Sequence, residues 1–141
     1  MAPPESAPRR DATMKSILIA EGDDLVAELF ASLFARDGWT VTTCLDGQRA
    51  ADALGGSVAY DAVVVSNQLH NMGGVELITR IRGLAHRQDV PIVMVTGIME
   101  VSIMAAALTA GADDVLYKPT DVGILVDTVN KCIERRRQQD T

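Results

Sequence analysis

The sequence has few cysteines and no long apolar run, and both shortages narrow the class of protein. The two cysteines, Cys44 and Cys132, stand far apart in apolar surroundings. They lack the spacing of metal ligands, which indicates buried free thiols. No stretch approaches the ~18 apolar residues that a membrane span needs, and residues 1–10 lack the apolar core of a signal peptide. We therefore expect a soluble cytoplasmic domain with no membrane partner.

Basic residues are also scarce. The chain carries 13 Lys and Arg against 19 Asp and Glu, which gives a formal net charge of −6. Such a surface disfavours nucleic acid and anionic lipid as the main contact. The one basic cluster, Arg135–Arg137, suits the C-terminus of a helix, where cations interact well with the helix dipole. We expect no nucleic-acid partner.

What is present is the composition of one globular domain. Of 141 residues, 48% are hydrophobic and 23% are charged, which is enough for a substantial core. Residues 1–14 hold three of the five prolines and almost no apolar side chain, so we expect a disordered tail there. The folded domain is expected over residues 15–137, followed by a short tail over 138–141.

Two segments have the pattern of strands buried on both faces. Tyr60–Val65 and Val90–Val95 are nearly continuous apolar runs rich in valine, which is typical of the middle of a parallel sheet. Ser16–Ala20 and Asp114–Tyr117 are shorter strand candidates. Trp39–Thr43 alternates between apolar and polar residues, which favours a position near a sheet edge.

Helical patterns fill the intervals between these strands. The apolar positions predict helices that begin near residues 25, 46, 74, 101 and 122. In the fourth helix the expected buried residues are Val101, Met104, Ala105 and Leu108. Strand and helix alternate five times with short connections. The sequence therefore predicts an α/β fold, a doubly wound five-stranded parallel sheet with five helices.

In such a sheet the chemistry lies at the carboxyl edge. The residues that follow the predicted strands there are Glu21, Gly22, Asp23, Ser66, Thr96 and Lys118. Carboxylates, hydroxyls and one ammonium group are thus expected to meet in one pocket.

The spacing of these residues resembles the receiver domain of bacterial two-component response regulators, a flavodoxin-like fold. The resemblance covers roughly residues 15–136. Besides the pocket residues, it rests on Ile17–Ala20, Tyr60–Asp61, Gly74–Leu77, Gly111–Asp114 and Lys118–Pro119.

The same resemblance shows what is missing. The family's phosphoacceptor aspartate falls on Ser66, and the second residue of its acidic pair, a metal ligand, falls on Gly22. Of the two switch residues, Thr96 is retained but the aromatic one falls on Val115. Acyl-phosphate formation requires a carboxylate and a cation held by oxygen ligands. The resemblance therefore implies a degenerate receiver without catalytic residues and with its magnesium site lost.

Each retained pocket residue also has a purely structural interpretation. Asp23 or Asp24 can cap the helix that follows, although a relocated metal ligand remains an alternative. Lys118 can pair with Glu21 or Asp23, and Thr96 can cap the turn after its strand. His70 stands close enough in the sequence to be considered as a base for Ser66.

Two functional classes follow from the resemblance. The first is a stand-alone signalling module, not an enzyme, that binds a protein partner without being phosphorylated. That partner would be a component of a histidine kinase pathway, an output protein or a second copy. Its expected contact surface on the last helix–strand–helix unit is Ile98, Met99, Ile103 and Ala107. The second class is a phosphoryl-accepting receiver that uses a non-standard site such as Asp23 or Ser66.

Nucleotide or flavin binding is a weaker alternative for this kind of sheet. The turn Glu21–Asp24 is acidic and contains one glycine, which is unsuited to cradling a phosphate.

Overall fold

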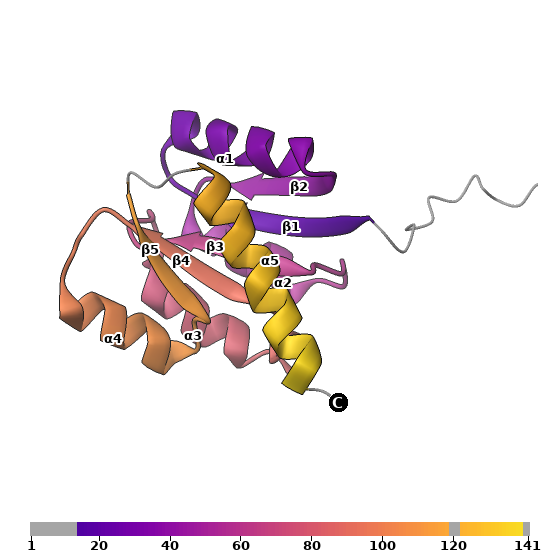
Figure 1. The fold of residues 1–141 in the computed structure, drawn as a ribbon. Helices are drawn as coiled ribbons and strands as arrows, with labels where there is room; N and C mark the ends of the chain where they lie inside the picture. Colours follow the sequence, from indigo (N-terminus) through magenta and orange to yellow (C-terminus); the bar gives the residue numbers. More distant parts are fainter. Residues whose placement is uncertain (1–13, 119–121, 140–141) are drawn as a thin grey trace, which may run out of the picture.

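The computed structural model describes residues 14–118 and 122–139. Five parallel strands form one sheet in the order β2-β1-β3-β4-β5 (Figure 1). Their bounds are β1 Lys15–Ala20, β2 Trp39–Cys44, β3 Ala62–Ser66, β4 Ile92–Thr96 and β5 Asp114–Tyr117. The predicted doubly wound parallel sheet is thus confirmed, with β2 at the expected edge.

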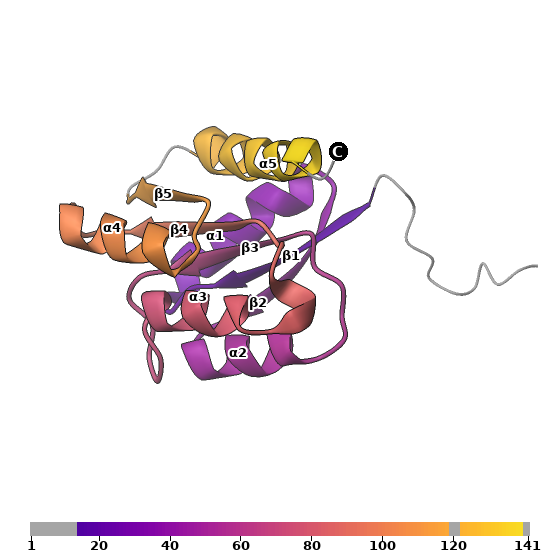
Figure 2. The same ribbon diagram turned by 90° about the horizontal axis from the view of Figure 1, so that it is seen from below.

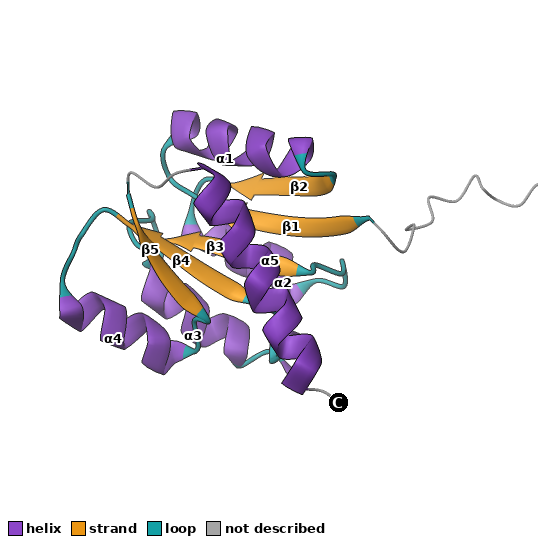
Figure 3. Ribbon diagram, viewed as in Figure 1, coloured by secondary structure: helices purple, strands orange, loops and turns teal. Residues whose placement is uncertain are grey.

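Five α-helices alternate with the strands (Figure 3). Their bounds are α1 Asp24–Arg36, α2 Gly47–Gly55, α3 Gly74–Arg82, α4 Val101–Ala110 and α5 Val122–Gln139, and a short 3-10 turn η2 spans Ala85–Arg87. Helices α1 and α5 cover one face of the sheet, and α2, α3 and α4 cover the other (Figure 2). None of the described helices is long and apolar enough to cross a membrane.

The two central strands have the burial that their sequences predict. All five residues of β3 and all five of β4 are buried, because each strand contributes alternate side chains to a core on either side of the sheet. The register places Ser66 beside Val95 and Thr96 beside Tyr117. The carboxyl ends of the strands therefore lie side by side.

The predicted helix boundaries are set by local capping. Asp23 caps α1 by accepting hydrogen bonds from two backbone amides, and Asp46 does the same for one amide of α2. Gly38 and Gly111 have positive φ angles of 92° and 124° just after α1 and α4, a conformation that favours glycine. Helix α5 continues to Gln139, so the C-terminal tail expected from residue 138 begins too early, because residues 138 and 139 still belong to the helix. The other residues of the predicted tails, 1–13 and 140–141, lie outside the described residues.

The buried face of α4 differs from the prediction. Ala107 is fully buried and Ile103 packs against the core, whereas Val101 is 79% exposed and Leu108 is 45% exposed. The expected stripe therefore faces outward. The physical reason is that apolar residues are spread around α4, which has no charged residue and only Ser102 and Thr109 as polar ones, so its sequence period selects one face only weakly.

This finding corrects the expected partner surface. Ala107 cannot contact a partner because it has no exposed area, and Ile103 is mostly engaged with the core. Met99 is 76% exposed and remains available, while Ile98 is half-buried. Helix α1 also exposes apolar side chains, because Leu25 and Leu29 face solvent while its described buried residues are Ala27, Phe30 and Phe34.

Candidate functional site

The ends of four strands bring the predicted pocket residues together. Glu21 follows β1, Ser66 ends β3, Thr96 ends β4 and Lys118 follows β5. The Lys118 Nζ atom lies 2.7 Å from Glu21 Oε1 and donates a hydrogen bond to Ser66 Oγ at 3.3 Å. The ammonium group of Lys118 therefore contacts both the Glu21 carboxylate and the Ser66 hydroxyl.

Three of the pocket residues are almost completely withdrawn from solvent. Glu21 and Ser66 are each 2% exposed, and Thr96 is 1% exposed. Lys118 approaches Glu21 Oε1 at ion-pair distance but out of line for a hydrogen bond. A buried carboxylate is costly unless a positive charge compensates it, so Lys118 is the group that makes a charged Glu21 tolerable here.

Asp23 is oriented by the helix that it caps. Its Oδ1 atom accepts hydrogen bonds from Leu25 N at 2.9 Å and Val26 N at 3.2 Å. Its own backbone amide donates to Glu21 Oε2 at 3.0 Å. The capping interpretation of Asp23 is therefore confirmed, and of the two partners considered for Lys118, Glu21 is the one found.

Thr96 also has the structural role considered for it. Its Oγ1 atom accepts a hydrogen bond from Ile98 N at 3.1 Å, which fixes the start of the loop toward α4. Val115, which occupies the aromatic switch position, lies within β5 and packs against the core beneath α2, α3 and α4.

No close contact requires a glycine at position 22, and the absence of a side chain there leaves an open space. A Cβ atom at this position would lie 3.5 Å from the carbonyl oxygen of Gln68 and 3.6 Å from that of Leu45, which is ordinary contact. The imidazole of His70 borders the same space and is exposed, while its carbonyl accepts a hydrogen bond from Gly47 N. A side chain at position 22 could therefore be accommodated in this space.

This space belongs to a groove of about 660 Å³ at the carboxyl edge. One wall is the start of α1 and the other is the loop after β3. The lining residues are Glu21, Gly22, Asp23, Val26, Asn67, Gln68, Leu69, His70 and Lys118.

The donor set of the groove does not fit magnesium. This ion prefers an octahedral shell of oxygen atoms, usually with one or two carboxylates. Gly22 offers no side chain, Ser66 Oγ is bonded to Lys118, and Glu21 is ion-paired with the same ammonium. Among the residues that the structure describes, no three His, Cys, Asp or Glu side chains gather as a metal cluster.

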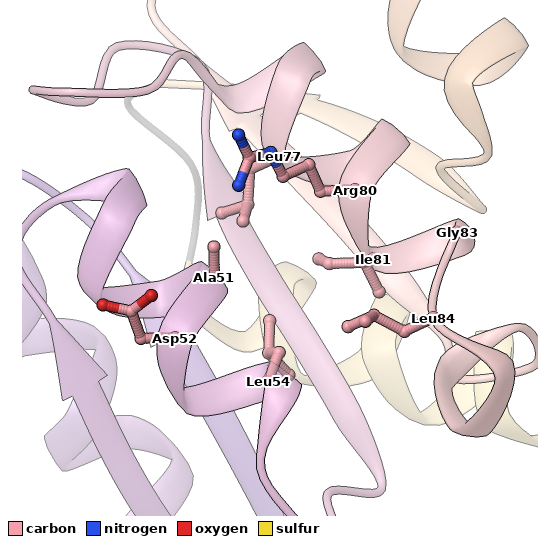
Figure 4. A pocket seen from close by; sticks show the side chains of 8 residues that line it. All are labelled: Ala51, Asp52, Leu54, Leu77, Arg80, Ile81, Gly83 and Leu84. Carbon is pink, nitrogen blue, oxygen red and sulfur yellow. The ribbon is translucent and has the colours of Figure 1, made fainter.

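A second cavity, of about 250 Å³, lies between α2 and α3 (Figure 4). Its lining residues are Ala51, Asp52, Leu54, Leu77, Arg80, Ile81, Gly83 and Leu84. None of the predicted site residues is among them. The apolar members look like any core positions in the sequence, so no sequence signal distinguishes this crevice from ordinary helix packing.

The cysteines are free thiols, as predicted. Burial raises the pKa of Cys132, and burial together with the nearby Asp46 raises that of Cys44. A raised pKa leaves little thiolate at neutral pH, so both groups are poor nucleophiles.

The sheet order and the groove at its carboxyl edge define a receiver-type α/β domain. Comparison with known proteins gives the same class. The family model "Response regulator receiver domain" matches residues 17–130, and the chain belongs to this family. It is therefore a receiver domain of two-component signalling, a class of domain that interacts with histidine kinases or output proteins.

Individual relatives agree with this assignment. Response regulator ArlR of Staphylococcus aureus is 30% identical over 128 residues, which cover 90% of this chain and 56% of that protein. The chain thus spans about half the length of the curated relatives that it matches. A two-component response regulator from Clostridium difficile superposes with a TM-score of 0.79 at 27% identity, over 86% of this chain and 97% of the other.

A CheY-like receiver domain protein from Methanospirillum hungatei gives a TM-score of 0.84 at 20% identity, over 90% of this chain and 99% of the other. This similarity supports the fold alone.

Proposed function

We propose that this chain is an atypical receiver module that acts through protein contacts without being phosphorylated at its pocket. The observation that carries the proposal is the position of Lys118, whose ammonium contacts both Glu21 and Ser66. The ammonium that the resemblance assigns to phosphoryl transfer is thereby engaged by residues of the pocket itself. The same proposal includes the absence of a magnesium cofactor and the cytoplasmic setting expected from the sequence.

The chemistry of Ser66 supports this reading. A serine hydroxyl is a weak nucleophile unless a base removes its proton. The described group bonded to Ser66 Oγ is an ammonium that donates to it, which draws electron density away from the oxygen. Phosphoryl transfer to Ser66 would therefore lack both a base and a metal.

The alternative acceptor, Asp23, is engaged as a helix cap. Its Oδ1 atom accepts two backbone hydrogen bonds at the start of α1. Phosphorylation on Oδ2 would leave Oδ1 as an uncharged carbonyl acceptor, which weakens the charge-assisted cap of the first turn. No observation at Asp23 favours phosphoryl chemistry over capping.

We propose the outward face of α4 as the protein-binding surface, in place of the face expected from the sequence. With Met99 just before the helix, it consists of Val101, Ala105, Leu108 and the half-buried Met104; Met99 and Val101 are more than three-quarters exposed. There is no charged residue between Glu100 and Asp113. Exposed apolar side chains gathered on an uncharged helix fit a surface covered by an output protein, a kinase-pathway component or a second copy.

Intact-mass measurement tests the central claim. The protein is incubated with magnesium and acetyl phosphate, and its mass is compared with that of an untreated sample. We expect no added phosphoryl group. An acid-stable gain would identify phosphoserine, a labile gain would identify an acyl phosphate, and either would refute the proposal.

A further inference from the structure

The groove at the carboxyl edge has the dimensions of a site for a small organic molecule. Its volume is about 660 Å³, and pockets for such ligands usually measure about 300–1,000 Å³. Two segments that are distant in the sequence form its walls. Val26 lies on the α1 wall, and Leu69 and His70 lie on the wall formed by the loop after β3. The groove therefore has an apolar side chain on each wall and room for a ligand between them.

The charges of the lining favour a cation. Two carboxylates, those of Glu21 and Asp23, and one ammonium, that of Lys118, line the groove. Lys118 is paired with Glu21, and no described base is paired with Asp23. The Oδ1 atom of Asp23 caps α1, while its Oδ2 atom accepts no hydrogen bond from the described residues. One negative charge at the groove is thus left for a ligand to neutralise.

Hydrogen-bond acceptors surround the open space beside Gly22. The carbonyl oxygens of Gln68 and Leu45 lie 3.5 Å and 3.6 Å from the position that a Cβ atom of Gly22 would take. Glu21 is 2% exposed, and its Oε1 atom receives no hydrogen bond from the described residues, although it is ion-paired with Lys118. A buried acceptor of this kind normally has a donor. The site therefore favours a ligand that brings several N–H groups.

The arrangement of these acceptors favours a flat cation over a point charge. The two carbonyl oxygens belong to different segments, one just before α2 and one just after β3. A planar group with divergent N–H donors can reach both at once. Guanidinium and amidinium groups have this shape, whereas an ammonium is compact and more strongly hydrated.

We propose that the groove binds a small organic cation, an amidine or guanidine attached to a ring or a short alkyl group. The cation occupies the space beside Gly22 and donates to the carbonyl oxygens of Gln68 and Leu45. Its apolar part packs between Val26 and Leu69, so the ligand links α1 to the loop after β3. This inference rests on the proposed function, because magnesium and a phosphoryl group in the groove would exclude the ligand.

The test uses the full chain labelled with ¹⁵N and benzamidine as the probe. Benzamide and benzoate have nearly the same shape but are neutral and anionic, and acetamidine keeps the cation but lacks the ring. With benzamidine, we expect amide chemical-shift changes confined to residues 21–26, 45 and 67–70. Benzamide and acetamidine should each bind about tenfold more weakly, because one lacks the charge and the other the apolar contacts. Benzoate should leave the spectrum unchanged.

Variants at two positions localise the cation. Gly22→Leu fills the space beside the carbonyl oxygens and should weaken benzamidine binding about tenfold or more. Gly55→Leu is the matched control, because Gly55 also has open surroundings but lies outside the groove, and it should bind as the wild type does. Asp23→Asn keeps the helix cap, since asparagine caps as well as aspartate, but it removes the charge and should weaken binding about fivefold.

The proposal is overturned if benzamide or benzoate binds as tightly as benzamidine, or if the shifts map outside the groove. It is also overturned if Gly22→Leu and Asp23→Asn both bind benzamidine like the wild type. Displacement of benzamidine by magnesium would identify the groove as a metal site and would overturn it as well. Phosphorylation is read from mass and ligand binding from shifts, so failure of the proposed function and failure of this inference are distinguishable.

Discussion

Lys118 and Glu21 form an ion pair between two strands that are not neighbours. Nζ and Oε1 are 2.7 Å apart, yet β3 and β4 lie between β1 and β5 in the sheet. The lysine side chain reaches across the end of β3 and contacts Ser66 on the way. Lys118 thus links the residues that follow β1 and β5 directly across the carboxyl edge.

This link should contribute measurably to stability. Lys118→Met leaves the Glu21 carboxylate, with a side chain only 3% exposed, without its counter-charge. We expect the free energy of unfolding to fall by about 2–4 kcal/mol, toward the lower part of the range for broken buried pairs because Lys118 itself is 26% exposed. Urea unfolding curves provide the measurement.

A double variant separates pairing from packing. Glu21→Gln combined with Lys118→Met removes both charges and should return stability to within about 1 kcal/mol of the wild type. As a control, Arg135→Ala breaks an exposed pair with Asp114 and should change stability by less than about 0.5 kcal/mol. A single variant as stable as the double one would show that the pair contributes nothing.

The reversed face of α4 gives a second prediction. Ala107→Glu introduces a carboxylate where no area is exposed, so the folded state should lose at least about 3 kcal/mol or fail to form. Leu108→Glu, one residue further along on the exposed side, should stay within about 1 kcal/mol. Thermal melting of both variants shows which residue is buried. If Leu108→Glu proved less stable than Ala107→Glu, the buried face expected from the sequence would be the correct one.

The strands were predictable because the composition of the central ones fits only one environment, the interior of a parallel sheet that is covered on both faces. A valine-rich run such as Val63–Val65 satisfies both faces of a parallel sheet, so its burial follows from its composition. The strand ends then place Ser66 and Lys118 at one edge without further information. Spacing alone therefore located the pocket.

Side-chain choices within the pocket were not predictable in the same way. From the sequence, Asp23 and Glu21 are equally suitable ion-pair partners for Lys118. In the structure Glu21 is the partner, because the Asp23 carboxylate turns toward the amides of α1. The face of α4 was predicted incorrectly because apolar residues are spread around the helix, with only Ser102 and Thr109 as polar ones. The space beside Gly22 depends on the loop that carries Gln68, whose path the sequence pattern does not determine.

The two thiols should be slow to react and should make stability decline at high pH. Burial raises the pKa of Cys132 and of Cys44 above the ordinary value. A raised folded-state pKa contributes stability that is complete below the unfolded pKa of about 8.5 and is lost as the pH rises through the folded value. Stability should therefore fall above about pH 8.5.

Thiol labelling with Ellman's reagent at pH 8 provides a second readout. The half-buried Cys44 should react before the buried Cys132, and both should react much faster in urea. Cys132→Ala should reduce the decline at alkaline pH, although it also removes packing. Rapid labelling of both thiols in the native protein would contradict the burial on which the prediction depends.

Restoring the two missing acidic residues should restore metal binding. Gly22→Asp is sterically acceptable, because a Cβ atom there makes only ordinary contacts, and Ser66→Asp supplies the second carboxylate. Together with Glu21, the double variant has the oxygen ligands that magnesium requires. In metal-free buffer the added carboxylates should repel one another and lower stability near neutral pH.

With magnesium at a hundredfold excess over Kd, the double variant should gain about 2.7 kcal/mol, from the relation RT ln(1 + [L]/Kd). Ser66→Asp alone should gain little, since the position of Gly22 still offers no ligand and Lys118 competes for both remaining carboxylates. The wild type should show no dependence at all. Melting curves of the three proteins with and without magnesium measure these differences. Equal stabilisation of the wild type and the double variant would mean that Glu21 and its neighbours already hold the metal, and the proposal that the magnesium site is lost would have to be abandoned.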